Sequence, residues 1–267
     1  MSLELLGYAA AVIMGLSLGL MGGGGSILTV PILAYLFGLD AVTATGLSLF
    51  IVGTTSAAGL LDHHRQGNIH WPTAALFGAA SIASVYTARH WLVPAIPDPL
   101  WQGDGFPLPK DTAILGLFAV AMLYSAIRMI RGNNRQEPAA AKHPTASLVA
   151  TGLGVGLLTG VLGAGGGFLI VPALVLIAGM DMKRAVGTSL LIITVNSYVG
   201  FAGDQTVHLA DHTTILLPFL GLAILGIVVG SRLAGRTRND MLRPAFGWFI
   251  LAMGAYIIVR ELYTITG

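Results

Sequence analysis

The sequence predicts an all-α integral membrane protein of two inverted repeats, each with a glycine-broken re-entrant helix hairpin and three spanning helices. The 267-residue chain is 55% hydrophobic and only 10% charged, whereas soluble domains carry roughly 25% charged residues. Residues 19–60 also occur a second time at 160–201, and both copies place a glycine cluster inside a hydrophobic stretch. Paired breaks at matching positions in two halves are typical of transporters that bind their substrate at the breaks.

The two copies align at a constant offset of 141 residues. The matched pairs are Gly22 and Gly163, Gly24 and Gly165, Gly25 and Gly166, Pro31 and Pro172, Gly38 and Gly179, Asp40 and Asp181, Gly46 and Gly187, and Ser48 and Ser189. This repetition divides the chain into a first membrane repeat at 1–131, a polar cytoplasmic linker at 132–145 and a second membrane repeat at 146–267.

Hydrophobic stretches of about 20 residues can span a bilayer as helices. Six are predicted: Ala41–Leu61, Ile69–Trp91, Asp111–Ile130, Ala185–Gly203, Thr213–Arg232 and Pro244–Leu262. Two longer stretches, Leu3–Phe37 and Ala146–Gly179, hold the glycine clusters. After the first cluster, Ile27–Phe37 provides about 16 Å of helix, half the hydrocarbon core. Each long stretch is therefore either one kinked span or a hairpin that returns to its starting side.

The distribution of basic residues distinguishes these two arrangements. With hairpins, eleven Lys and Arg residues fall on one side and three (Arg89, Lys110 and Arg260) on the other, whereas kinked single spans give eight and six. Because cytoplasmic loops carry the excess of basic residues, hairpins are favoured, with both termini outside the cytoplasm. The halves then enter from opposite sides, so the repeats are inverted. Ten ordinary short helices with a fortuitous charge distribution are the alternative.

The prolines of Val93–Lys110 forbid a regular helix, which predicts an ordered or semi-rigid outer loop. Trp71 and Trp91 lie near the two ends of the span Ile69–Trp91 and suit the interfacial belts. Asp40 and Asp181 precede spans and are expected to cap their N-termini.

The glycine clusters are the predicted substrate site. Non-helical backbone at membrane depth survives where it is buried in protein or lines a cavity. The short helices that follow are expected to start near Ser26 and Gly167, and their free N–H groups and dipoles favour an anion. The predicted binding residues in the two clusters are Gly23, Gly24, Gly25, Ser26, Gly165, Gly166 and Gly167. Tight helix packing is the alternative role, and Gly15-x-x-x-Gly19, Gly152-x-x-x-Gly156-x-x-x-Gly160 and Gly226-x-x-x-Gly230 are expected to serve packing.

Neutral polar residues in the following spans complete the predicted site. Ser48 and Thr55 are seven residues apart on one helix face, and Ser189 and Asn196 occupy the matching positions. Such donors can solvate an anion without a fixed cation. The alternative is that they bond to their own helix or bridge helices.

Several function classes are disfavoured. Gly163-x-Gly165-x-Gly167 with Asp181 superficially resembles a dinucleotide fingerprint, but it follows an apolar helix instead of a strand. With no cysteine and no helical pair of histidines, we expect no metal or other cofactor.

The seven histidines are expected to be solvated at span ends or in loops, with a pH-sensing role as the alternative. No ionisable residue falls at the centre of the membrane, which argues against a carboxylate proton relay and an embedded enzyme. Short basic loops set topology and do not indicate nucleic-acid binding.

At the duplicated Gly-x-Gly-Gly…Val-Pro motif, in Gly22–Pro31 and Gly163–Pro172, the chain resembles the sulfite exporter TauE/SafE family of membrane permeases. The resemblance covers both halves. It implies export of sulfite or organosulfonates, and it places Gly24, Gly25, Gly165 and Gly166 at the substrate site. Gly23 faces Ala164 across the repeats, so the two half-sites are expected to differ.

We therefore expect a secondary transporter in the cell inner (plasma) membrane that exports small oxyanions by alternating access. The expected partners are the anion, the lipid bilayer and a second copy in a homodimer. An anion channel, an importer of another small anion, and a membrane-embedded enzyme are the alternatives.

Overall fold

Helices make up almost all of the chain that the structure describes. The computed structural model describes residues 3–103, 106–131, 145–237 and 239–266. Its helices are α1 (Leu3–Met21), α2 (Gly24–Tyr35), α3 (Ala41–Arg65), α4 (Trp71–Thr87), η1 (Ala88–Leu92), α5 (Val93–Ala95), α6 (Lys110–Arg131), α7 (Thr145–Leu162), α8 (Gly167–Leu176), α9 (Met182–Gly203), η2 (Leu209–His212), α10 (Thr213–Arg236) and α11 (Asn239–Thr266). The predicted linker at 132–145 lies outside the described residues except for Thr145.

Seven helical segments of the described chain are long and apolar enough to cross a membrane. They are Leu3–Met21, Ala41–Arg65, Lys110–Arg131, Thr145–Leu162, Met182–Gly203, Leu209–Arg236 and Pro244–Glu261. α4 has 17 residues and continues into the π-helical η1 and then α5. The short apolar helices are α2 and α8. The predicted helical architecture is confirmed, and its seven long apolar helices are consistent with an integral membrane protein.

The N-terminal caps of the long helices follow from the sequence as predicted. Asp40 precedes α3, and its Oδ1 accepts a hydrogen bond from the backbone N–H of Thr43 at 2.9 Å. Asp181 precedes α9 and accepts from the N–H of Arg184 at 3.2 Å. Each carboxylate thus satisfies an N–H group that has no partner inside its helix.

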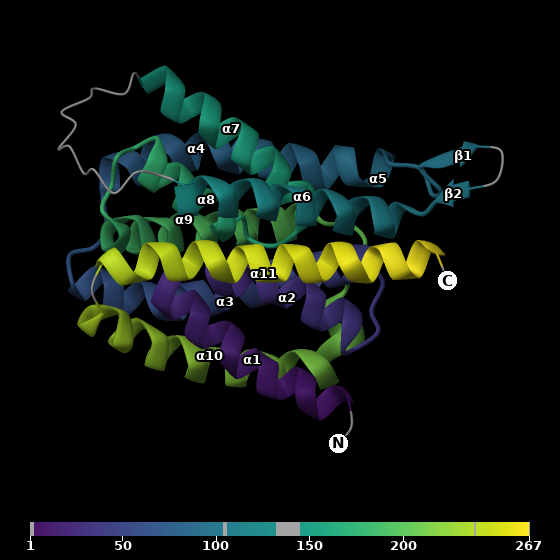
Figure 1. Cartoon of the computed structure of the whole chain (residues 1–267), viewed down its shortest axis with the longest axis horizontal. Helices are drawn as coiled ribbons and strands as arrows, with labels where there is room; N and C mark the ends of the chain where they lie inside the picture. The colour runs from purple at the N-terminus through teal and green to yellow at the C-terminus, as the bar shows by residue number, and fades with distance from the viewer. Residues whose placement is uncertain (1–2, 104–105, 132–144, 238, 267) are drawn as a thin grey trace.

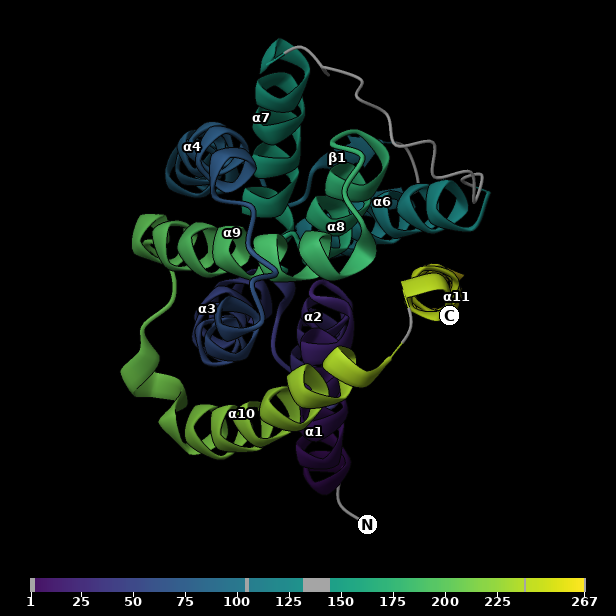
Figure 2. The same ribbon diagram turned by 90° about the vertical axis from the view of Figure 1, so that its left-hand side faces the viewer.

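The first helix of each half packs on a helix of the other half. α3 and α9 pack together in the middle, while α1 of the first half packs on α10 of the second, and α7 of the second half packs on α4 of the first (Figure 2). α6 and α11, the last helices of each half, pack on each other. Every principal contact of one half is therefore matched by a contact in the other half.

Glycines allow these helix pairs to approach closely. A Cβ on Gly15 of α1 would overlap the backbone of Ala223 on α10, and a Cβ on Gly156 of α7 would overlap the backbone of Ser81 on α4. Gly226 and Gly230 of α10 are packed against α1 in the same way. The predicted packing role of these spaced glycines is confirmed.

Both termini and the segment between α5 and α6 lie at the same end of the bundle (Figure 1). Two three-residue strands, β1 (Trp101–Gly103) and β2 (Phe106–Leu108), pair there as an antiparallel hairpin, which the sequence analysis did not predict. The helix also runs on through Pro94 to Ala95, so the predicted non-helical loop from Val93 begins too early. Pro94 lies one residue before the end of this continuous helical run, so its missing N–H interrupts the helix only in its last turn.

Candidate functional site

Each glycine cluster produces a sharp reversal of the chain. Gly22 has φ +69°, and Gly163, Gly165 and Gly166 have φ between +63° and +70°. Residues with a side chain rarely adopt this region. After the first break, α2 folds back along α1, so that the ring of Phe37 beyond α2 lies 5.2 Å from that of Tyr8 near the start of α1.

The two breaks meet in the interior. A Cβ on Gly23 would overlap the carbonyl group of Gly167, and a Cβ on Gly167 would lie 2.5 Å from the Cα of Gly23 and 3.1 Å from Oγ of Ser26. The first residues of α2 and α8 are therefore in backbone contact. In the described structure neither helix has a side chain that caps its N-terminus. Since a helix N-terminus carries a partial positive charge, two such ends at one point favour a negative ligand.

Each break also lies against the long helix of the opposite half. A Cβ on Gly22 would lie 2.8 Å from both the Cα of Val186 and the Oγ of Ser189 on α9. A Cβ on Gly163 would lie 2.6 Å from the Cα of Thr45 on α3. Thr45 and Val186 occupy matching positions of the repeat, so the contact is reciprocal.

The predicted site residues are all buried, but only some are at the breaks. Ser26 donates to the carbonyl oxygen of Gly23 at 2.8 Å, and Ser189 donates to that of Val186 at 2.8 Å beside Gly22. Ser48 has a buried hydroxyl with no hydrogen-bond partner among the described residues.

The two deepest predicted donors have partners of their own. Thr55 donates to the carbonyl oxygen of Ile51 in its own helix at 2.7 Å. Asn196 accepts from and donates to Ser81 of α4, at 3.1 and 2.9 Å. Thr55 thus bonds to its own helix and Asn196 bridges two helices, which are the two alternatives to anion binding stated for these residues.

The four glycines placed at the site by resemblance differ in their surroundings. A Cβ on Gly24 would make ordinary contacts, at 3.4 and 3.5 Å from Met21 and Phe246. A Cβ on Gly25 would overlap Met14 and Leu18 of α1, so this glycine is needed to close the first hairpin. The Cβ positions of Gly165 and Gly166 fall beside hydroxyl groups of the second half.

These hydroxyls belong to residues that the sequence analysis missed. A Cβ on Gly165 would lie 3.0 Å from Oγ of Ser197, and one on Gly166 would overlap Oγ1 of Thr159. Within the described residues, neither Ser197 nor Thr159 has a hydrogen-bond partner, although both are fully buried. Ser56, which matches Ser197 at the offset of 141, is also buried without a partner. Because Ser56 and Ser197 match across the repeat, Ser197 could have been predicted from the sequence.

A buried ion pair lies next to the second break. The Nε of Arg89 in η1 donates to Oδ2 of Asp204 at 2.6 Å, and its Nη1 donates to Oγ1 of Thr45 at 3.2 Å and to the carbonyl oxygen of Gly160 at 3.5 Å. Burial raises the pKa of Asp204, but Arg89 and hydrogen bonds from Thr206 lower it by more, so the pKa lies below its ordinary value. The charge distribution predicts Arg89 on the outer side, and its burial is not predicted from the sequence.

The expectation of solvated histidines is wrong for His63. Its ring is 1% exposed, and Nε2 lies 3.4 Å from the carbonyl oxygen of Gly19, at the end of α1. Gly19 matches Gly160 at the offset of 141. Each helix that leads into a break is therefore contacted near its end by a buried nitrogen-bearing side chain of the first half, α1 by His63 and α7 by Arg89.

Comparison with known proteins identifies the class of this site. The family described as Sulfite exporter TauE/SafE matches residues 7–257. The chain belongs to the sulfite exporter TauE/SafE family. No solved structure matches the chain significantly.

Relatives of this TauE/SafE chain are known in bacteria and archaea. A "Probable membrane transporter protein" of Xylella fastidiosa is 30% identical over 261 residues, covering 93% of this chain and 92% of the relative. Proteins of Methanocaldococcus jannaschii and Bacillus subtilis, also named as probable membrane transporters, are 24% and 28% identical. They cover 93% and 87% of this chain, and 94% and 91% of their own lengths. The family and these names indicate a membrane transporter, and no enzymatic activity is indicated.

Proposed function

We propose that this protein is a secondary transporter that exports small oxyanions, sulfite or an organosulfonate, from a site between the two glycine breaks. The observation that supports this most strongly is the backbone contact of Gly23 with Gly167, because it brings the N-termini of α2 and α8 together. Backbone N–H groups and two converging helix dipoles bind an anion, and Ser26, Ser48, Ser189 and Ser197 supply hydroxyl groups. Thr55 and Asn196 join this shell when they exchange their present partners for the substrate.

Two closures, one on each side of this site, support alternating access. At one end, Arg89 and Asp204 join η1 to the end of α9. At the other end, the backbone N–H of His70 donates to Oγ1 of Thr188 at 2.9 Å, near the start of α9. Asp204 follows Thr188 by 16 residues, which corresponds to about 24 Å of helix, most of the roughly 30 Å thickness of the hydrocarbon core. Opening one closure while the other holds exposes the site to one side at a time.

The orientation of this cycle rests on the charge distribution of the loops. The repeats are inverted, both termini lie outside the cytoplasm of a cell whose inner membrane holds the protein, and residues 132–145 lie inside. An inside-negative potential favours export of an anion by about 2.3 kcal/mol per charge per 100 mV. Net export therefore requires no carboxylate proton relay.

The test is flux from proteoliposomes loaded with sulfite, sulfate, taurine or sulfoacetate. With a potassium gradient and valinomycin, at equal pH and without sodium, sulfite or a sulfonate should leave the negative compartment with saturation kinetics. Flux that rises without saturation would indicate the alternative, an anion channel. Flux that ignores the potential and follows a pH gradient would overturn potential-driven export, and transport only in the inward direction would indicate an importer.

A further inference from the structure

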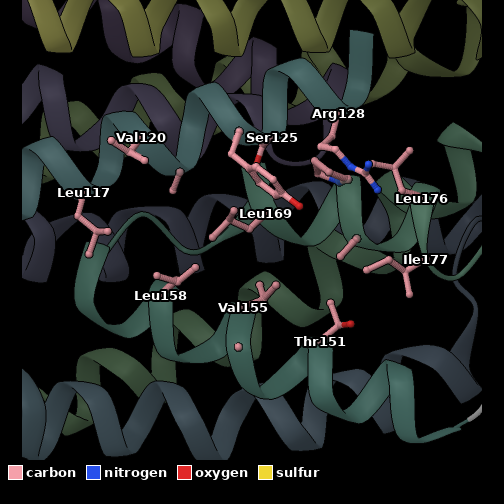
Figure 3. Close-up of a pocket in the computed structure, with 15 residues that line it drawn as sticks. Leu117, Val120, Ser125, Arg128, Thr151, Val155, Leu158, Leu169, Leu176 and Ile177 are labelled. Carbon is pink, nitrogen blue, oxygen red and sulfur yellow. The ribbon is translucent and has the colours of Figure 1, made fainter. Parts of the chain in front are cut away.

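A groove runs on the surface of the bundle between α6 of the first half and α7 and α8 of the second half. Its volume is about 560 Å³, which lies within the range of sites that bind small organic molecules. Leu117 and Val120 of α6, Leu158 of α7 and Leu169 of α8 line much of its length (Figure 3). Leu117 and Val120 are 42% and 60% exposed, so the groove opens to the surroundings of the bundle.

The groove exists because the second hairpin is less tightly packed than the first. In the first half, Gly25 of α2 lies directly against Met14 of α1. In the second half, α7 packs on α4 through Gly152 and Gly156 but makes much less contact with α8 than α1 makes with α2. Gly154 lines the groove, and no atom lies within 4 Å of the position that its Cβ would take. The seam between α1 and α2 is therefore filled by protein, whereas the seam between α7 and α8 is open.

One end of the groove is cationic. Of the described residues that line it, Arg128 is the one with a charge, and Figure 3 shows it at the end away from Leu117. Arg128 is exposed near the end of α6. No hydrogen bond or ion pair within the described chain engages its guanidinium group. The groove is thus apolar along most of its length and ends at a positive charge that has no partner among the described residues.

We propose that this groove binds one acyl chain of an anionic phospholipid, whose phosphate pairs with Arg128. The chain crosses a membrane, so lipid surrounds the open face of α6 and α7. A guanidinium group matches phosphate with two parallel hydrogen bonds, and it lies near a helix end, where headgroups are found. The bound acyl chain fills the seam between α7 and α8 that protein fills between α1 and α2, and so supports the helix that follows the second break.

The test is native mass spectrometry of the purified chain, titrated with phosphatidylglycerol and phosphatidylcholine of identical acyl chains. We expect phosphatidylglycerol to bind roughly fivefold more tightly, the effect of one arginine near a headgroup. Arg128→Gln should abolish this preference. Arg131→Gln is the matched control, because Arg131 is exposed at the end of the same helix but does not line the groove.

A second pair of variants tests the acyl chain separately from the headgroup. Gly154→Phe fills the groove from a position with open space and should weaken binding of both lipids. Gly116→Phe adds the same bulk at an open position on the neighbouring helix α6, outside the groove, and should have no effect. Equal affinity of the wild type for both lipids, equal losses in the two arginine variants, or dimer formation that Gly154→Phe prevents would each overturn the proposal. If Gly154→Phe fails to insert, the arginine variants alone decide.

Discussion

Arg89 and Asp204 are 115 residues apart in the sequence and form a buried ion pair, with side chains that are 1% and 2% exposed. Arg89 also donates to Thr45 of α3 and to the carbonyl oxygen of Gly160 near the end of α7. A Cβ on Gly46 would lie 2.7 Å from Oδ2 of Asp204, so this repeat glycine makes room for the pair. The pair therefore ties together four segments beside the second break.

Loss of one partner should strongly destabilise this region. Asp204→Asn leaves the buried guanidinium group without a counter-charge, which we expect to cost about 3–5 kcal/mol. The measurement is the melting temperature of the detergent-purified protein. Asp181→Asn is the control, because asparagine also caps helices and the melting temperature should hardly change. Similar losses in the two variants would contradict a special role for the pair.

The same carboxylate should limit stability in acid. The pKa of Asp204 lies below its ordinary value of 3.8. A lowered pKa in the folded state means that the stabilisation is complete above the ordinary pKa and is lost as the pH falls through the folded-state pKa. We expect the difference in melting temperature between wild type and Asp204→Asn to stay constant from about pH 8 to about pH 5 and to shrink below about pH 4. A difference that already shrinks at neutral pH would show that another group controls the pair.

The class of fold was predictable because it depends on features that are local in the sequence. Hydrophobic stretches fix the spanning helices, and Asp40 and Asp181 fix where two of them begin. Spaced glycines identify the faces that pack closely. The exchange of α1 and α7 between the halves is a property of tertiary packing, and the β1–β2 hairpin rests on residues with no alternating pattern.

The site was predictable in its backbone but less so in its side chains. Glycines at positive φ leave a clear signature, and the breaks lie where the sequence puts them. Which face of α3 and α9 points at a break depends on helix rotation, and the sequence gives no direct measure of that rotation. As a result, Asn196 was chosen although it contacts α4, and its neighbour Ser197 was missed. Arg89 was predicted on the outer side near the end of the span Ile69–Trp91, because its burial depends on Asp204, which is distant in sequence.

The contact between the two breaks should be sensitive to a single methyl group. Gly23→Ala places a Cβ against the carbonyl group of Gly167, whereas Gly24→Ala places one at ordinary contact distances. We expect Gly23→Ala to abolish sulfite or sulfonate flux in proteoliposomes and Gly24→Ala to retain most of it. Both proteins should be checked for normal expression and gel-filtration behaviour. If Gly23→Ala inserts and transports normally, the contact is not part of the site.

The orientation in the membrane can be tested by labelling, since the chain has no cysteine. Gln66→Cys lies in the exposed turn between α3 and α4, and Leu100→Cys lies in the exposed segment before β1. The charge distribution predicts that a membrane-impermeant maleimide labels Leu100→Cys in intact cells and labels Gln66→Cys only after lysis. The reverse pattern would invert the proposed topology, and labelling of both from outside would rule it out.

Ser197 and Asn196 are adjacent on α9 and should respond in opposite ways to the loss of their polar groups. The Ser197 hydroxyl is buried beside Gly165 with no partner in the described structure, and a buried hydroxyl in that condition costs about 1–3 kcal/mol. Ser197→Ala should therefore raise the melting temperature. It should also weaken anion binding about tenfold or more, since a hydrogen bond to a charged group contributes about 1.5–3 kcal/mol.

Asn196→Ala removes both hydrogen bonds to Ser81 and should lower the melting temperature. Calorimetric binding and thermal melting of the two variants separate these effects. A hydroxyl that serves a ligand is expected to lower the stability of the ligand-free protein. If Ser197→Ala instead lowers the melting temperature and leaves the affinity for the anion unchanged, the Ser197 hydroxyl has a structural role.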